Sequence, residues 1–590
     1  MIFDSDSSEE DEEITTTTSE HIPAQASLTI SDKKEVVAYE SAEFIEAKGA
    51  ISKNPFDKNA WEILLSEVEK GGHKSAILGT FSEATVQFPR SSVLWQRFTD
   101  FLIHCGETQQ AEDAFRKCLT KCRSVKLWVS YLNLIRNKTV GQHPPSSDHY
   151  ANTKKTYESA FENSIENVGT SIDMNVLWRR YINFVLEWPD MKESDSGRKL
   201  TVLRDLYQRA ICTPMEALDS FWKEYEEWEM KASKHLADQL LPEFKRKYQD
   251  ARNIYKERKK LHASLDMAYI APPPSLEGSI VEMKQLELWN QLIKAEMKNS
   301  YDYTVETQLR PSLDLIFDRF LCCFFFHPEA WMMFSKYKLK FYGIIEARNA
   351  LKEAILVIPK VPTLWLELAE LEETSGDINS ALDILRLCFE QNPSPFTFSV
   401  FQKFIRRKEG KAAARQLFSD TIVLREEGVL GLDTYVAHAS LELRVNNAPE
   451  VALRVLEAGR KHTPAAYSSM TYILALAKVL VRLGDFRQLR WVYETNVGLL
   501  EESEAILKTH KNNNKFKVQD ELSLWEELLE AEITIGMSDT KRLTLLQEKV
   551  RLTKAECDKI LNTSSHCKVD LFEPIQQLHA RYFIKCCVYY

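Results

Sequence analysis

The stretch DSFWKEYEEWEMKAS, residues 219–233, brings aromatic rings and carboxylates together, a mixture that can support acid–base catalysis. Such catalysis needs two carboxyl groups in one cleft with pKa values pushed apart. If the stretch is a helix, only Glu229 is in register with Trp222 and Tyr225. The other carboxylates lie off the aromatic face and are expected to point to water: Glu224, Glu226 and Glu227. We therefore interpret the stretch as structural.

The rest of the sequence offers no recognised catalytic or metal-binding motif. It contains no nucleophile elbow, Walker loop, dinucleotide-binding glycine pattern or HExxH motif. The 11 cysteines are scattered without a CxxC pair, and no His/Cys cluster has the spacing of a zinc site. We expect buried free thiols, no metal, no cofactor and no enzymatic activity.

Composition points to a long helical protein. The chain has 590 residues, too many for one compact core, so several domains or an elongated array are expected. It contains 18 glycines, far below the usual share of roughly 7%, and this scarcity favours α-helix over tight hairpins. The net charge of −10 argues against nucleic acid wrapped over the whole surface. Neither a signal peptide nor an apolar run of roughly 20 residues is found, so we expect a soluble intracellular protein without membrane contact.

Large aromatic residues recur at a nearly constant interval. Trp61 and Trp95 lie 34 residues apart, Trp128 follows after 33, and Phe401 and Tyr435 are again 34 apart. This interval is typical of helix-turn-helix repeats of the tetratricopeptide kind. The repeat-signature tryptophans are Trp61, Trp95, Trp128, Trp178, Trp222, Trp289, Trp331, Trp365 and Trp525.

Each signature aromatic opens the same local pattern. A second large apolar residue stands three positions on, as Tyr225 does after Trp222, and a glutamate often stands seven positions on. These offsets share one face of a helix, which we name helix A. The glutamates are predicted to be structural, accepting a hydrogen bond from a neighbouring helix: Glu229, Glu296, Glu372, Glu442 and Glu532.

A second amphipathic segment, led by alanine or arginine, follows about twenty residues after each helix A and is predicted to be its partner, helix B. Examples are RDLYQRAI (204–211), ARNALKEAI (347–355) and ARQLFSDTI (414–422). Proline signals such as those at 358–360 and 392–394 separate the pairs. We expect an all-α solenoid of about twelve helix pairs between Trp61 and Leu561, because stacked neighbours bury the faces that a single pair cannot.

Three kinds of segment fall outside the repeat. Ala271 and the three prolines that follow it interrupt the array and are expected to mark a change of direction. Residues 139–150 are expected to form a loop. The predicted domains are an acidic disordered tail at 1–35, a first array at 36–266, a linker at 267–285, a second array at 286–561 and a cap or tail at 562–590.

Two charged segments carry alternative interpretations. The acidic tail contains Ser7 and Ser8 in a pattern that acidophilic kinases phosphorylate, although a solubilising tail is the simpler interpretation. Residues 243–262 hold eight cations against three anions, a local charge of +5. This run is either a solvated outer face or a contact for RNA phosphates or an acidic partner, without sequence reading: Lys245, Arg246, Lys247, Arg252, Lys256, Arg258, Lys259 and Lys260.

The helix pattern resembles the half-a-TPR (HAT) repeat of RNA-processing proteins. The order of several segments is similar to one family, the suppressor-of-forked family of large scaffold subunits of cleavage stimulation factor. The segments that carry the resemblance are ISKNPFDKNAWEILLSE (51–67), FPRSSVLWQRF (88–98), LWRRYINFVLEWP (177–189), LYQRAICTP (206–214), YKERKKLHASLD (255–266) and HPEAW (327–331).

The resemblance implies a non-enzymatic nuclear scaffold for pre-mRNA 3′-end cleavage and polyadenylation. It implies a first array of five repeats and a second array that forms a homodimer. It also implies contact with an RRM-bearing RNA-binding subunit, a WD-repeat subunit and polyadenylation-specificity factors, so that RNA is met mostly through partners. A proline-rich tail that recruits the RNA-binding subunit belongs to the family pattern and is not found in these 590 residues.

Other interpretations remain open at this point. The chain is alternatively a HAT-repeat scaffold of the spliceosome or of ribosome biogenesis, or a protein that binds RNA directly. The segment SSMTYILALAKVLVRLG (468–484) is apolar on most sides, more than a simple solenoid helix requires. Either it is deeply buried in the superhelix or it joins a homodimer interface.

Overall fold

The computed structural model describes residues 41–563 except for short gaps. The gaps are 72, 139–149, 189–192, 275–278, 300–302, 422–423, 425–429, 464–465, 497–517 and 536–539. Ser7 and Ser8 in the acidic tail, most of the loop expected at 139–150 and nearly all of the segment from 562 onward lie outside the described residues.

The described chain is a helical solenoid without strands, and the prediction of about twelve helix pairs is confirmed. After α1 (Ala42–Lys53), the helices A and B alternate as expected. The first five pairs are α2 (Lys58–Gly71) with α3 (Lys74–Gln87), α4 (Ser92–His104) with α5 (Thr108–Cys118), α6 (Val125–Lys138) with α7 (Tyr150–Val168), α8 (Asn175–Leu186) with α9 (Glu193–Ile211), and α10 (Leu218–Ala232) with α11 (Lys234–His262).

Seven further pairs make up the second array. They are α12 (Ile280–Met297) with α13 (Arg310–Cys323), α14 (Pro328–Phe341) with α15 (Ile344–Val357), α16 (Pro362–Ser375) with α17 (Ile378–Gln391), α18 (Pro395–Lys408) with α19 (Lys411–Asp420), α21 (Leu432–Arg444) with α22 (Pro449–His462), α23 (Met470–Leu483) with α24 (Phe486–Asn496), and α26 (Val518–Ile535) with α27 (Thr540–Thr563). A short π-helical turn (Val305–Leu309) precedes α13, and a 3-10 turn (Ala466–Ser468) precedes α23.

Local sequence explains where these helices begin and end. Pro362 occupies the first turn of α16, where its missing N–H has no helical partner to lose. The same helix ends at Gly376, whose φ of 90° is the left-handed conformation that glycine adopts without strain. In α18, Ser394 and Thr397 form a capping box in front of the buried face. The proline and glycine signals between repeats therefore act as helix boundaries.

The signature aromatics are buried in their pairs, except Trp365, which is partly buried. Phe401 and Tyr435, which replace tryptophan, are each only 4% exposed and fill the same position. In four repeats the indole N–H donates to the carbonyl six residues upstream and so ties helix A to the turn before it. These bonds are Trp61 to Pro55 (2.8 Å), Trp95 to Pro89 (2.9 Å), Trp331 to Phe325 (2.8 Å) and Trp365 to Pro359 (3.0 Å).

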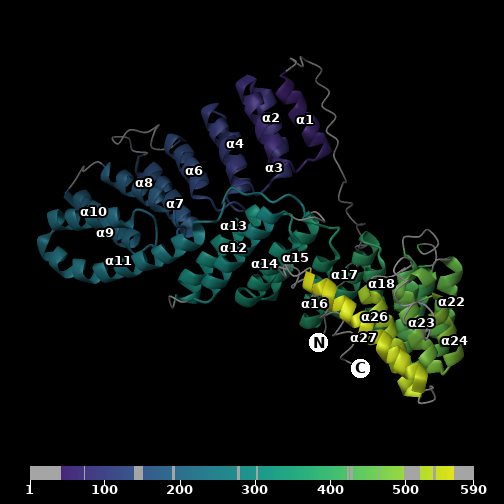
Figure 1. Cartoon of the computed structure of the whole chain (residues 1–590). Helices are drawn as coiled ribbons and strands as arrows, with labels where there is room; N and C mark the ends of the chain where they lie inside the picture. The colour runs from purple at the N-terminus through teal and green to yellow at the C-terminus, as the bar shows by residue number, and fades with distance from the viewer. Residues whose placement is uncertain are drawn as a thin grey trace, which may run out of the picture.

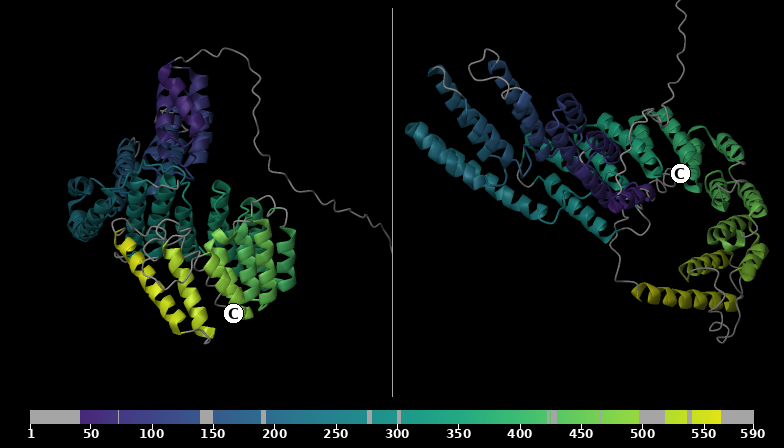
Figure 2. Two further views of the ribbon diagram at one scale, coloured as in Figure 1. Left: turned by 45° about the vertical axis from the view of Figure 1, so that its right-hand side comes forward. Right: turned by 90° about the horizontal axis from the view of Figure 1, so that it is seen from above.

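The two arrays fold back on each other. In Figure 1 the first array, purple to blue, lies over α12–α15 at the beginning of the second array, and the second array continues to α27, in yellow. Seen from above in Figure 2, the second array curves into a hook, and α11 runs along the outer edge of the first array. The long α11 is the last helix of the first array. It leads directly into the region where the two arrays meet, which we call the joint.

The proline segment differs from the expected linker. We predicted a linker at 267–285, but α12 already begins at Ile280. The backbone N–H of Ala271 donates to the carbonyl of Cys323 (2.7 Å), and the His327 ring lies 3.0 Å from the carbonyl of Pro272. The described part of the segment is thus fixed against the second array, because a proline-rich chain without its own helix finds its hydrogen bonds there.

Candidate functional site at the joint of the two arrays

All five signature glutamates are buried and bound to an arginine. In each case the arginine belongs to helix B of one pair and the glutamate to helix A of the next pair. The bonds therefore connect successive repeats: Arg204 to Glu229, Arg258 to Glu296, Arg348 to Glu372, Arg415 to Glu442 and Arg490 to Glu532. Such charge-assisted bonds fix the geometry of two helices more precisely than apolar contact alone.

The bond to Glu229 answers the question of acid–base chemistry. Arg204 Nε lies 3.0 and 2.9 Å from the two carboxylate oxygens, and its Nη2 lies 2.7 Å from one of them. Glu229 has no solvent exposure, so it has no access to a substrate. Glu224 does not simply point to water, because it pairs with Arg179. The stretch at 219–233 is a connection between repeats.

Sequence reasoning missed the arginine half of these bonds. Arg204, Arg348, Arg415 and Arg490 each directly follow a buried leucine or alanine at the inward face of helix B. The sequence signal is the arginine at or near the start of these segments, to which the sequence pattern alone assigned no partner. Two features identify these arginines. Each stands next to a buried residue on helix B, and a buried glutamate follows about one repeat later.

Arg90 joins the two arrays in the turn between α3 and α4. Its guanidinium donates to Glu353 of α15 (2.9 Å) and lies over the rings of Phe325 and Trp331, 5.7 and 5.3 Å from their centroids. The residue is only 6% exposed. An arginine in this position is held by an ion pair and by two cation–π contacts in a place that excludes water. Beside it, the rings of Phe56 and Phe326 meet edge to face at 4.7 Å.

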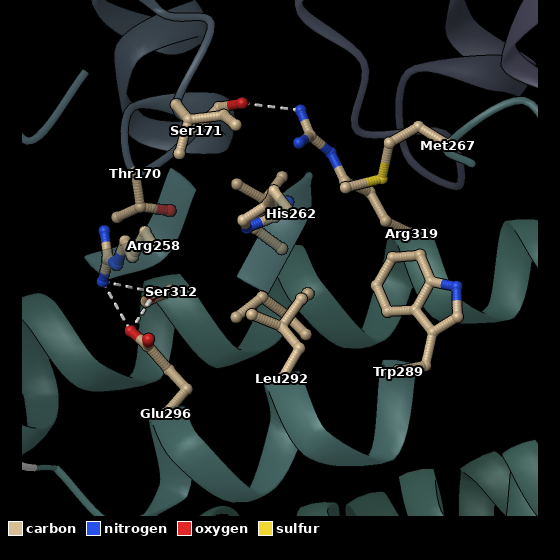
Figure 3. A pocket seen from close by; sticks show the side chains of 13 residues that line it. Thr170, Ser171, Arg258, His262, Met267, Trp289, Leu292, Glu296, Ser312 and Arg319 are labelled. Carbon is tan, nitrogen blue, oxygen red and sulfur yellow. Dashed lines mark hydrogen bonds and ion pairs between the residues drawn. The ribbon is translucent and has the colours of Figure 1, made fainter. Parts of the chain in front are cut away.

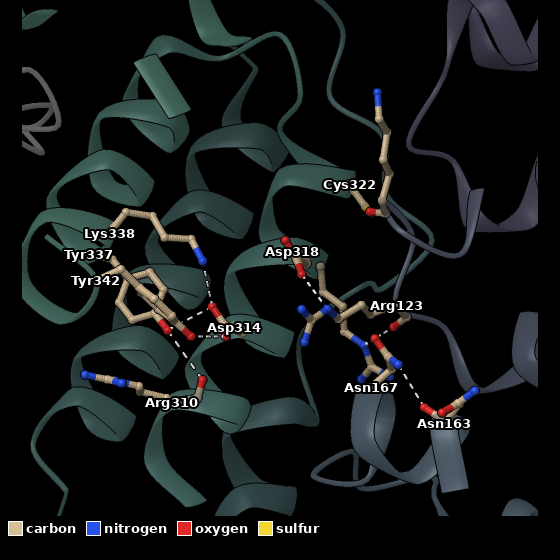
Figure 4. Close-up of polar contacts among 12 residues, drawn as sticks. Arg123, Asn163, Asn167, Arg310, Asp314, Asp318, Cys322, Tyr337, Lys338 and Tyr342 are labelled. Atoms are coloured by element: carbon tan, nitrogen blue, oxygen red, sulfur yellow. Dashed lines mark hydrogen bonds and ion pairs between the residues drawn. The ribbon is translucent and has the colours of Figure 1, made fainter. Parts of the chain in front are cut away.

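A second polar contact joins the arrays beside α13. Arg123, in the turn before α6, binds Asp318 at 2.7 Å (Figure 4). Arg319 donates to the carbonyl of Arg123 (3.2 Å) and to the Ser171 hydroxyl (2.7 Å). On the far side of α13, Asp314 accepts from Tyr337 and Lys338 of α14, at 3.0 and 2.9 Å. The turns of the first array therefore dock on a helix that is itself tied to the next pair.

A small cavity of about 20 Å³ lies among α11, α12, α13 and residues 170–172. Figure 3 shows His262 between Arg258 and Arg319, with Arg258 bound to Glu296 and Ser312. Burial, together with the positive charges of Arg319 and Arg258, lowers the pKa of His262 to about 4. The space suffices for one water molecule and not for an organic ligand. The cavity belongs to the packing of the joint.

The eight predicted cations of α11 differ in burial and in ion pairing. Arg258 is wrong as a surface contact, because it is 6% exposed and binds Glu296 at 2.5 Å inside the joint. Arg252 is half-buried and binds Asp219 at 2.8 Å, and Lys247 binds Glu243 at 2.7 Å. The remaining cations are exposed: Lys245, Arg246, Lys256, Lys259 and Lys260.

The apolar helix of the second array is explained by burial. Tyr472, Ile473, Leu476 and Leu480 of α23 lie in the core that α21, α22, α24 and α26 share. Val479 is buried in the same core, and the other large apolar side chains of the helix are partly buried there. The composition of this helix therefore requires no second chain.

The part of the chain that the structure describes holds free thiols but neither a metal-binding cluster nor a membrane-spanning helix. Eight cysteines of the described part are free thiols, and burial raises the pKa of Cys118 to about 12. Among the described residues, no group of three or more His, Cys, Asp or Glu side chains is arranged to hold a metal ion. None of the described helices has the length and apolarity needed to cross a bilayer.

The order and geometry of these repeats agree with one known family. The family model described as suppressor of forked protein (Suf) matches residues 43–580. The chain belongs to the suppressor-of-forked family. The family resemblance inferred from the six sequence segments is thereby confirmed.

Curated relatives cover most of the chain. Cleavage stimulation factor subunit 77 of Arabidopsis thaliana is 27% identical over 449 residues, which are 76% of this chain and 57% of the relative. Protein suppressor of forked of Drosophila melanogaster is 22% identical over 83% of this chain and 67% of the relative. mRNA 3′-end-processing protein RNA14 of Saccharomyces cerevisiae is 22% identical over 78% of this chain and 72% of the relative. The chain spans little more than half the length of the Arabidopsis relative.

A solved structure shares the fold. The crystal structure of CstF-77 aligns with 79% of this chain and 89% of its own length, at a TM-score of 0.53 and 16% identity. At this identity the likeness shows the helical architecture alone. It agrees with the pairs of helices described above.

Proposed function

We propose that the protein is a non-enzymatic nuclear scaffold of mRNA 3′-end cleavage and polyadenylation. The observation that carries the proposal is the match of the suppressor-of-forked model to residues 43–580, which is nearly the whole solenoid. The relatives are named as a cleavage stimulation factor subunit and as mRNA 3′-end-processing proteins. Proteins of that machinery act on pre-mRNA, hence the nuclear location.

A scaffold fits the chemistry of the side chains. The most deeply buried carboxylates are bound to arginines between repeats and have no access to a substrate. What the solenoid offers is a long, helical surface on which several proteins can bind at once. The proposed partners are an RRM-bearing subunit, a WD-repeat subunit and polyadenylation-specificity factors, with RNA met mostly through them. The proposed domains are a first array at 36–266 and a second at 286–561.

We also propose that the second array forms a homodimer. Trp491 of α24 is 52% exposed, although its neighbours Leu489, Val492 and Tyr493 are buried. An exposed tryptophan is frequent at the centre of protein interfaces because its large ring loses much water contact on binding. Sedimentation of the full chain at micromolar concentration is expected to give twice the monomer mass, and Trp491→Glu is expected to give monomers. A native chain that sediments as a monomer contradicts the dimer.

The test of the scaffold is purification of the tagged full-length protein from nuclear extract. Polyadenylation and cleavage factors are expected to co-purify. Recovery of spliceosomal particles or pre-ribosomes in their place would identify the chain as a scaffold of another RNA-processing complex and overturn the proposal. Treatment of the extract with ribonuclease separates partners bound through protein surfaces from those bound through RNA.

A further inference from the structure

The charges on the second half of α11 are separated into two rows. Glu243, Asp250 and Glu257 recur every seven residues, and a cation stands two residues after each of them: Lys245, Arg252 and Lys259. A helix turns about 100° per residue, so two residues correspond to about 200° and place the rows on nearly opposite sides. The acidic row therefore does not neutralise the basic row.

Two further lysines widen the basic row into a face. Lys256 and Lys260 project within the same arc as Lys245, Arg252 and Lys259, and the five cations span about 100° of the helix circumference. From Lys245 to Lys260 the row extends about 22 Å at 1.5 Å per residue. We call these five residues the α11 basic face. Arg246 flanks it, whereas Lys247 and the buried Arg258 lie outside it.

Most of this charge is not used inside the protein. Lys245, Lys256, Lys259 and Lys260 are exposed and make no ion pair with any residue that the structure describes. Only Arg252 is partly neutralised, by Asp219 of α10 at 2.8 Å. Arg252, Lys256 and Lys260 follow one another at intervals of four, and like charges at this spacing repel each other along one face of a helix. An anion from outside would relieve this repulsion.

The four lysines of the face are exposed, whereas Arg252 between them is half-buried against Asp219 of α10. The rest of α11 packs on α9, α10 and α12, and Tyr248, which borders the face, stacks on Trp222 with ring centroids 5.0 Å apart. Seen from above in Figure 2, α11 forms the outer edge of the first array. Tyr248 and Tyr255 border the face, but both are partly buried: Tyr248 stacks on Trp222, and Lys259 lies over the Tyr255 ring at 5.7 Å. Neither ring therefore offers a free platform on which a base can stack.

We propose that the α11 basic face binds the phosphate backbone of single-stranded RNA without reading its sequence. Four of the five cations are lysines, which bind phosphate as point charges, whereas recognition of planar carboxylates favours the arginine fork. A straight row of charges at intervals of about one helical turn suits an anion with regularly repeated charges. The inference goes beyond the proposed function, because it concerns direct contact with RNA and does not depend on which factors assemble.

The test measures binding of a fluorescent 20-nucleotide oligouridylate to the purified full-length protein. With four lysine–phosphate contacts, the affinity is expected to fall about 50-fold when salt rises from 50 to 200 mM. Reversal of the four lysines is expected to weaken binding at 50 mM salt by at least about 100-fold. These changes are Lys245→Glu, Lys256→Glu, Lys259→Glu and Lys260→Glu.

A matched variant separates the face from net charge. Four exposed lysines elsewhere make no ion pair with a described residue, and their reversal alters the net charge equally: Lys126→Glu, Lys352→Glu, Lys360→Glu and Lys411→Glu. This control is expected to stay within about threefold of the native affinity, because its charges are dispersed. Replacement of the four face lysines by arginine is expected to retain binding and to exclude a folding defect as the cause of loss.

Three results would overturn the proposal. The first is unchanged binding when the face is reversed, and the second is equal loss in the face variant and in the control. The third is competition by oligoglutamate of matched charge as strong as competition by oligocytidylate, which would make the face a site for acidic protein segments. Co-purification of processing factors is a separate readout, so this inference and the proposed function fail independently.

Discussion

Arg415 of α19 binds the carboxylate of Glu442 of α21 through two parallel hydrogen bonds of 2.8 and 2.6 Å. The two partners differ in their surroundings, because the side chain of Glu442 is fully buried while 41% of Arg415 is exposed. Water can therefore stabilise the arginine alone but not the glutamate alone. The same inequality of exposure holds for Arg204 and Glu229 and for Arg490 and Glu532.

Removal of the arginine should accordingly harm the fold more than removal of the carboxylate charge. Arg415→Met leaves a buried carboxylate without a partner and is expected to lower the local unfolding free energy by about 3–5 kcal/mol. Glu442→Gln leaves an arginine that water still reaches, and a smaller loss of about 1–2 kcal/mol is expected. Hydrogen exchange of the amides in α19 and α21 measures both values, and equal losses would contradict the argument.

The same bond predicts that the stability of the folded protein depends on pH in the acidic range. Burial raises the pKa of Glu442, but the bonds from Arg415 outweigh burial and hold the pKa below its ordinary value of 4.5. A depressed pKa stabilises the folded protein above pH 4.5, and this contribution is lost as pH falls through the folded-state pKa. The urea midpoint of the native protein should therefore drop more steeply below pH 4.5 than that of Glu442→Gln. Parallel curves would show that this carboxylate does not titrate with unfolding.

His262 predicts a second dependence of stability on pH, in a less acidic range. Its pKa is about 4 in the folded protein and near 6.5 when unfolded, so the unfolded chain binds the proton more readily. Stability from the neutral ring is complete above about pH 6.5 and is lost as pH falls towards 4, by about 3 kcal/mol at most. His262→Asn should flatten the urea midpoint between pH 6.5 and 4.5. A variant with the native slope in this range would contradict the assignment.

Arg90 should hold the two arrays together. Arg90→Met removes the bond to Glu353 and both cation–π contacts, so faster hydrogen exchange is expected in 318–358 and in the turn at 88–91. Arg116→Met is the matched control, since Arg116 is 74% exposed and pairs only with Asp113 three residues away. Small-angle scattering should report an expanded particle for the first variant alone. Identical profiles for both variants would show that Arg90 is dispensable to the joint.

Much of the fold could be predicted because a repeat places the same residue types at the same spacing many times. The spacing of Trp331 and Trp365 and the glutamate seven residues after Trp365 give both the helix pair and its buried face. Even Phe401 and Tyr435 fitted the register, since the position requires a large ring more than an indole. Periodicity therefore predicts the contacts between neighbouring repeats.

The joint could not be predicted in this way. Arg90 and Glu353 lie 263 residues apart, and nothing periodic relates them. Arg258 was misread because a run of cations was counted by charge without its helical phase. It lies seven residues after the buried Ala251, so its position on the inward face was present in the sequence. The acidic row and the basic face of α11 follow from the same reasoning.

The docking of the first array on α15 has a consequence for biosynthesis. Arg90 leaves the ribosome 263 residues before Glu353. At roughly 5–20 residues per second, this interval is about 13 to 50 s. During that time the first array can complete its five pairs, but Arg90 and Phe56 remain without their distant partners. The nascent chain thus exposes its half of the joint to the cytoplasm before the other half has been synthesised. This is the stage at which a chaperone would be most useful.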